Sequence, residues 1–274
     1  MTNRAVGRLP LAAITLALTC ASVAYADGAD TAGDGASPVS AVDWADYGRS
    51  VAFNVSKSQG IAGRVELMED ARIKPAMKGW FSGTRWAWGG CDQAKPSTAM
   101  AAVCESLSKK PLVPAQLRLV DADGVVHESL DLRYPEAEVQ TSHLYGDARV
   151  SYLVTVRDSV GAGVDALETN IAEVINSELR WVPYVNVDDG KVDLLGFAHS
   201  VKVGWKAVPA KSHRGSDILS VGGGPNGSVL EPKPGYTLTL SRYTFESGQW
   251  RRYTRDTEGY WDYEHAFPPR NIFP

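Results

Sequence analysis

The residues that carry most enzyme chemistry are present in this chain, but their spacing matches no local catalytic or metal-binding motif. Ser220 has Ile218 where a nucleophile elbow requires glycine. The glycine-rich run 222–227 lacks the lysine and the following helix of a phosphate loop. No two histidines are two or four residues apart, so no local zinc motif exists; they are His127, His143, His199, His213 and His265. We therefore predict no metal ion and no cofactor.

Paired carboxylates are the remaining route to catalysis. Glycosidases need two acids within a defined separation, and the sequence alone brings no two acids together. Asp158 follows an apolar strand and precedes the Gly161-x-Gly163 loop, although a turn-forming aspartate explains it equally well. A hydrolase of polysaccharide, with acids at one end of the sheets, is thus an alternative hypothesis. The candidate acids are Glu136, Glu138, Asp147, Asp158, Asp165, Glu168 and Glu173.

The N-terminus is typical of an export signal. Arg4 and Arg8 precede the apolar run 9–23, and Ala24-Tyr25-Ala26 is a small-x-small cleavage site. We expect a signal peptide over 1–26 that is cleaved after Ala26, a periplasmic or secreted protein, and no transmembrane segment after cleavage. The apolar run is short for a membrane span. Cleavage removes two arginines and no acid, so the net charge moves from −4 to −6.

Two cysteines stay in the exported chain, Cys91 and Cys104. Export favours oxidation, and their spacing fits no CxxC motif. We predict a structural disulfide that stabilises the fold by about 3 kcal/mol in the chain-entropy model. The bond would join the predicted helix 97–108, which contains Cys104, to the end of a tryptophan-rich strand.

A surface rich in aromatic and arginine side chains is the best candidate for partner binding. Arg251, Tyr253 and Arg255 alternate with Trp250 and face away from it, and Tyr260 and Trp261 follow in the C-terminal tail. Aromatic residues and arginine are enriched in protein interfaces. We predict an exported, non-catalytic β-protein that binds a protein or a component of the cell envelope. The acidic net charge argues against a nucleic-acid partner.

These residues must be positioned by sheets, because the chain after residue 115 consists of short alternating strands and tight turns. Turns at Asp123-Gly124, Asn176-Ser177, Asp189-Gly190 and Ser247-Gly248 predict four hairpins. Three of them share one template, in which an apolar pair closes the turn. The predicted closing pairs are Val174 with Leu179, Val187 with Val192, and Phe245 with Trp250.

Two further segments have a predicted orientation. The run 199–208 alternates as one strand with Val201 and Trp205 on its buried face. The tail 259–274 is expected to lie extended over the edge of a sheet and to bury Trp261 and Phe267. Trp181, Trp205 and Trp250 share faces with valine and leucine, so we expect them in the core.

Taken together, the patterns predict an all-β fold of antiparallel, hairpin-rich sheets with one short helix near 97–108. A β-sandwich and a propeller-like meander both fit. The expected organisation is a signal peptide (1–26), a disordered leader (27–41), an N-terminal region with the disulfide-stapled helix (42–114), and a β domain with its extended tail (115–274). The N-terminal region either folds separately or packs on the β domain. A composition of 44% hydrophobic and 22% charged residues is ordinary for a globular protein.

Overall fold

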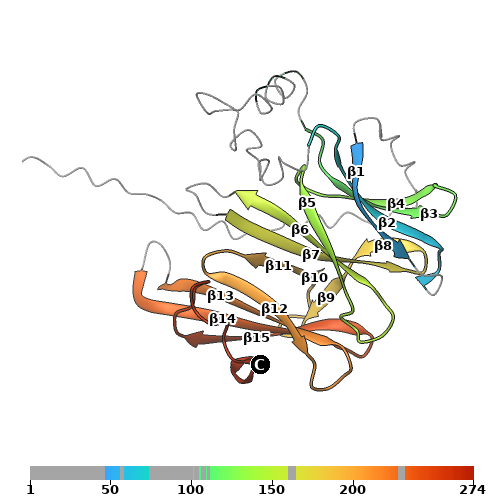
Figure 1. Cartoon of the computed structure of the whole chain (residues 1–274). Helices are drawn as coiled ribbons and strands as arrows, with labels where there is room; N and C mark the ends of the chain where they lie inside the picture. The colour runs from blue at the N-terminus through green and yellow to red at the C-terminus, as the bar shows by residue number, and fades with distance from the viewer. Residues whose placement is uncertain are drawn as a thin grey trace, which may run out of the picture. The chain divides into compact units, whose positions relative to one another are not determined.

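A computed structural model of the chain describes residues 47–55, 59–73, 101, 105, 109, 112–159, 165–227 and 232–274. Residues 43–274 form one compact unit. The predicted all-β fold is confirmed, because three sheets with antiparallel and mixed pairing make up the described chain, consistent with a β-sandwich (Figure 1). Around the expected helix 97–108, Ala101, Glu105 and Lys109 are helical and exposed. Cys91 and Cys104 lie outside the described residues, so their disulfide stays a prediction.

Sheet A contains four strands in the order β1-β2-β3-β4. They are β1 (Tyr47–Val55), β2 (Gly63–Asp70), β3 (Gln116–Asp121) and β4 (Val126–Asp131). The predicted hairpin at Asp123-Gly124 joins β3 to β4, and Gly124 adopts the left-handed conformation that glycine favours (φ 87°). Since β2 pairs with β3, strands from both sides of residue 114 share this sheet.

Sheet B has the strand order β11-β7-β6-β5, and β8 pairs with the far end of β7. Its strands are β5 (Ala137–Ser142), β6 (Ser151–Ser159), β7 (Asp165–Ile175), β8 (Glu178–Trp181) and β11 (Gly196–His199). The predicted turn at Asn176-Ser177 is confirmed, with φ values of 52° and 69°. The predicted closing pair of Val174 and Leu179 is also confirmed.

Sheet C has the strand order β10-β9-β15-β14-β13-β12. Its strands are β9 (Pro183–Asn186), β10 (Val192–Leu194), β12 (Val203–Pro209), β13 (Ser216–Gly227), β14 (Pro232–Glu246) and β15 (Gln249–Glu258). The turn at Ser247-Gly248 forms as predicted, with φ values of 52° and 82°. The predicted register is confirmed by the pairing of Phe245 with Trp250 and of Arg242 with Tyr253.

Two of the predicted segments differ in the structure. Val192 pairs with Val185 instead of Val187, and Val187 and Val192 are exposed. The loop is wider than the template because the Val187 N–H donates to the Arg252 carbonyl on β15. The run 199–208 is not one strand, since the chain turns at residues 200–202 between β11 and β12 and leaves Val201 exposed.

Buried side chains form two cores and one further cluster. One core joins sheets A and B, and a second joins sheet B to β13, β14 and β15 of sheet C. Trp250 is fully buried in the second core, while Trp181 and Trp205 are partly buried at the margins of the two cores. The third cluster packs Trp261 and Phe273 of the tail against four aliphatic side chains of β13 and β14.

The tail was expected to lie over the edge of a sheet. In the structure it packs on a face of sheet C, against side chains of β13 and β14. Trp261 packs so closely on β12 that a Cβ atom at Gly204 would lie 2.7 Å from its ring. Arg270, in the short 3-10 helix η4 (Arg270–Ile272), binds the buried carboxylate of Asp217 and the Pro209 carbonyl. These contacts anchor the tail across β12, β13 and β14.

Candidate functional site

Arg251, Tyr253 and Arg255 lie on the face of β15 opposite Trp250, as their alternation predicts. Arg255 is exposed, and Arg251 and Tyr253 are half-buried. The Tyr253 ring lies 5.1 Å from the guanidinium carbon of Arg242, and its hydroxyl donates to Glu246. These cross-strand contacts hold the Tyr253 side chain in place on the surface. Whether the three residues bind a partner stays a prediction.

Tyr260 and Trp261 are separated by the structure, although they are adjacent in the sequence. Trp261 is only 6% exposed and belongs to the cluster beneath the tail. Tyr260 is 48% exposed and packs edge-on against Tyr236, with 5.0 Å between ring centroids. Lys202 Nζ lies 4.1 Å and 4.6 Å from the centroids of these two rings. Of the two tail residues, Tyr260 alone is available to a partner.

The outer edge of β15 is only partly paired. On one side, β15 pairs with β14 along its whole length, from Gln249 to Glu258. On the other side, β15 pairs with β9 only at Trp250, Arg251 and Arg252. From Tyr253 to Glu258, no strand in the described part of the chain covers this edge. We call residues 253–258 the free edge of β15.

The hydrogen bonds at the two ends of the free edge show which backbone groups point away from β14. The Arg252 carbonyl accepts from Val187 on the β9 side, and the Gly259 N–H donates to Tyr236 on the β14 side. Because the N–H and C=O of one residue point the same way and alternate along a strand, Thr254, Asp256 and Glu258 point outward. Their backbone donors and acceptors have no backbone partner among the described residues.

A pocket of about 500 Å³ lies between sheets A and B. It contains two of the carboxylates that the sequence singled out, Glu136 and Glu138, together with Arg157. Glu136 is buried and Glu138 is exposed, and Glu138 accepts a hydrogen bond from Gln140. Ser50, Val51 and Leu67 line the opposite side from β1 and β2. The two acids are only two residues apart in the sequence, and none of the other candidate acids is among the described residues that line the pocket.

Glu173, another candidate acid, lies outside this pocket. Its side chain is buried beside the second core and accepts a hydrogen bond of 2.9 Å from Ser151. Burial raises the pKa of Glu173, while hydrogen bonds from Tyr145 and Ser151 and the charge of Arg149 oppose that rise. One carboxylate oxygen has no hydrogen-bond partner. Glu173 thus resembles a catalytic acid in its pKa but not in its access to solvent.

Replacing Glu173 with glutamine should increase stability at neutral pH. A carboxyl whose folded-state pKa is raised stabilises the fold fully below the unfolded pKa and loses that contribution as the pH rises. Glutamine removes the cost of the buried charge, so we expect a gain on the order of 1 kcal/mol at pH 7. Urea unfolding at pH 4 and pH 7 measures the change in the free energy of unfolding. Glu178→Gln, at an exposed position, is the control. A loss of stability at pH 7 would contradict this account.

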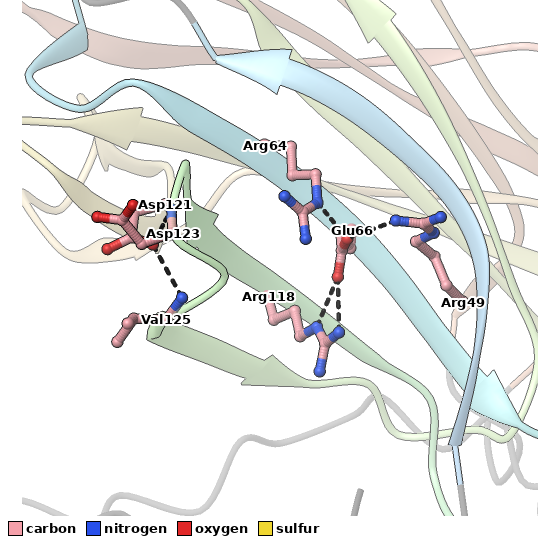
Figure 2. A network of polar contacts seen from close by, with 7 residues as sticks. All are labelled: Arg49, Arg64, Glu66, Arg118, Asp121, Asp123 and Val125. Atoms are coloured by element: carbon pink, nitrogen blue, oxygen red, sulfur yellow. Dashed lines mark hydrogen bonds and ion pairs between the residues drawn. The ribbon is translucent and has the colours of Figure 1, made fainter.

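A cluster of arginines that sequence reasoning missed surrounds Glu66 on sheet A (Figure 2). Arg118 is directly opposite Glu66 on β3, and its Nε and Nη2 atoms lie 2.8 and 2.7 Å from Glu66 Oε2. Arg64, two residues earlier on β2, and Arg49 on β1 donate to Oε1. The alternation of Arg64 with Glu66 was visible in the sequence, but only the register of three strands shows that the residues meet.

Chemical sites of other kinds are not indicated by the described residues. They include no group of three or more His, Cys, Asp or Glu side chains that could hold a metal ion. No described helix is long and apolar enough to cross a membrane. Comparison with family models, with curated proteins and with solved structures finds no match for this chain.

Proposed function

We propose that this chain is an exported, non-catalytic β-protein that binds a protein partner of the cell envelope through the free edge of β15. The observation that supports this proposal is the outward row of backbone groups at Thr254, Asp256 and Glu258. An extended peptide can add to such an edge as one more strand and satisfy these groups. The predicted export signal at residues 1–26 supports the further proposal of a periplasmic or extracellular location.

The side chains beside the free edge provide the specificity. Tyr253 and Arg255 lie on one face of the edge, and exposed Tyr260 lies just beyond its end. Main-chain hydrogen bonds give affinity in strand addition, whereas alternate side chains select the sequence of the added strand. A peptide is favoured over a polysaccharide because its backbone has the repeat of donors and acceptors that the edge offers.

A proline at the free edge should weaken partner binding about tenfold while leaving the hairpin intact. The Asp256 N–H points away from β14, so Asp256→Pro removes an outward donor and adds a ring where the new strand would lie. The matched control is Asp256→Ala, which also loses the side-chain bond to Thr239 but keeps the N–H. We expect Asp256→Pro to retain about tenfold less partner than Asp256→Ala, since one or two lost hydrogen bonds correspond to roughly 1.4 kcal/mol.

The measurement is recovery of envelope proteins on immobilised wild-type protein and on the two variants, followed by quantitative mass spectrometry. Thermal unfolding of each variant verifies that the fold is kept. Charged residues on an edge can also serve only to prevent aggregation. In that case Asp256→Pro and Asp256→Ala would recover the same proteins in equal amounts, and the proposed function would be wrong.

The second candidate function is hydrolysis of polysaccharide, which the pocket between sheets A and B favours. Glu136 and Glu138 in different environments are a suitable starting point for acid and base roles. Turnover of envelope polysaccharide that is lost in both Glu136→Gln and Glu138→Gln, and kept in Asp256→Pro, would establish this function instead.

A further inference from the structure

The arginine cluster on sheet A concentrates positive charge on a single face. Three guanidinium groups, those of Arg49, Arg64 and Arg118, share the single carboxylate of Glu66. Two other acids on this face have partners of their own, since Arg72 binds Asp70 and Gln116 donates to Asp131. Within this cluster, three guanidinium groups therefore face one carboxylate, while the neutral amide of Gln116 leaves the negative charge of Asp131 in place.

Glu66 acts as the anchor that holds the arginines together. Its side chain is 1% exposed, and the guanidinium groups approach it from β1, β2 and β3 (Figure 2). Burial alone would raise the pKa of Glu66, but hydrogen bonds from Arg64, Arg118 and Arg49 outweigh it and lower the pKa to about 2. The carboxylate therefore stays charged at physiological pH and can accept hydrogen bonds from all three arginines.

Arg49 and Arg64 keep donors available to solvent. Their side chains are 56% and 32% exposed, compared with 16% for Arg118. Each donates to Glu66 through one nitrogen, and the described part of the chain provides no second acceptor for either. A guanidinium carries five N–H groups in a planar fork, so each of these two arginines can still bind an oxyanion.

The two acids at the β3–β4 turn, Asp121 and Asp123, lie near the arginine cluster but are not part of it (Figure 2). Asp121 accepts the N–H groups of Asp123 and Val125 and lies 2.8 Å from His127 Nε2. Figure 2 shows Asp121 and Asp123 at the β3–β4 turn, to the side of the three arginines. The Asp121 carboxylate serves the hairpin, and no contact joins either acid to Arg49 or Arg64 among the described residues.

We propose that Arg49 and Arg64, held in place by Glu66, form a binding site for a phosphate group on the outer face of sheet A. Guanidinium groups bind phosphate through paired, charge-assisted hydrogen bonds, and two of them supply the charge that a phosphate monoester requires. The exposure of Arg49 (56%) and Arg64 (32%) suits a phosphate displayed on a larger body, such as a lipid headgroup, as well as free phosphate. The site is independent of the free edge of β15.

The test titrates the purified protein with inorganic phosphate by calorimetry at low ionic strength, because salt screens such contacts. The variant Arg49→Gln/Arg64→Gln should bind phosphate at least tenfold more weakly. The control, Lys191→Gln/Lys211→Gln, removes the same charge from exposed positions in other loops and should bind within twofold of wild type. Arg49→Lys/Arg64→Lys keeps the charge without the planar fork and should be intermediate, which covers the case that the glutamine variant fails to fold.

A second arm distinguishes the two sources of phosphate. Sedimentation with vesicles that contain phosphatidic acid, whose phosphate is a monoester, assigns the site to a lipid headgroup if binding is competed by glycerol phosphate and lost in the arginine variants. Binding of phosphate without vesicle binding assigns it to a soluble phosphate ester. The proposal is overturned if neither probe binds saturably, or if the lysine control loses as much binding as the arginine variants.

Discussion

Replacement of Trp250 by alanine should lower the free energy of unfolding by about 3–5 kcal/mol, the usual cost of emptying a buried aromatic site. Trp250 is 1% exposed and packs with Tyr145 and Phe245 at centroid distances of 5.6 and 5.8 Å. Its indole Nε1 also donates to the Tyr145 hydroxyl at 2.9 Å. The substitution thus opens a cavity and removes a partner from a buried hydroxyl.

Urea unfolding of Trp250→Ala, compared with Trp250→Phe and Tyr253→Ala, measures this effect. Phenylalanine keeps most of the volume but not the N–H, so we expect an intermediate loss of about 2 kcal/mol. Tyr253 lies on the outward face of the same strand, so Tyr253→Ala should lower the free energy of unfolding by about 1 kcal/mol or less. Equal losses for Trp250→Ala and Tyr253→Ala would show that the second core is not packed as described.

The second large effect is acid sensitivity that depends on Glu66. Its folded-state pKa of about 2 lies below the unfolded value, so its contribution is complete above the unfolded pKa of about 4.5 and is lost as the pH falls toward 2. Allowing for solvent screening of the partly exposed arginines, we expect Glu66→Gln to lose about 2 kcal/mol at pH 7. The difference from wild type should shrink steadily below pH 4.5.

Unfolding by urea between pH 2.5 and pH 7 provides the measurement, within the range set by the two pKa values. Glu128→Gln, on the exposed strand β4, is the matched control and should follow the wild-type curve. A difference between Glu66→Gln and wild type that stays constant across this range would contradict the assignment of Glu66 as the charged anchor.

Local turn chemistry explains why much of the fold could be predicted from the sequence. Ser247-Gly248 and Asn176-Ser177 adopt left-handed conformations that allow a two-residue turn, and this fixes the register of both hairpins. The hairpin at Asp189-Gly190 was misjudged because Val187 bonds to Arg252, far away in the sequence. The parallel pairing of β9 with β15 joins segments far apart in the chain, so no local sequence pattern predicts it.

The candidate sites depend on contacts between distant segments and were therefore less predictable. Alternation placed Arg251, Tyr253 and Arg255 on one face, but the sequence could not show where β9 stops pairing with β15. Arg118 meets Glu66 across 52 residues, so no local spacing indicates the arginine cluster. Trp261 was both a candidate surface residue and a residue that the tail was expected to bury. Its packing against Gly204 on β12 decides for burial, and local spacing cannot show that contact.

Amide hydrogen exchange along β15 tests the central claim most directly. In the protein alone, the amides of Tyr253, Arg255 and Thr257 should exchange slowly, because they face β14. Those of Thr254, Asp256 and Glu258 should exchange rapidly and should become protected when the partner recovered from the envelope is added. Protection of all six amides in the protein alone, or no change in these three on partner binding, would contradict strand addition at the free edge.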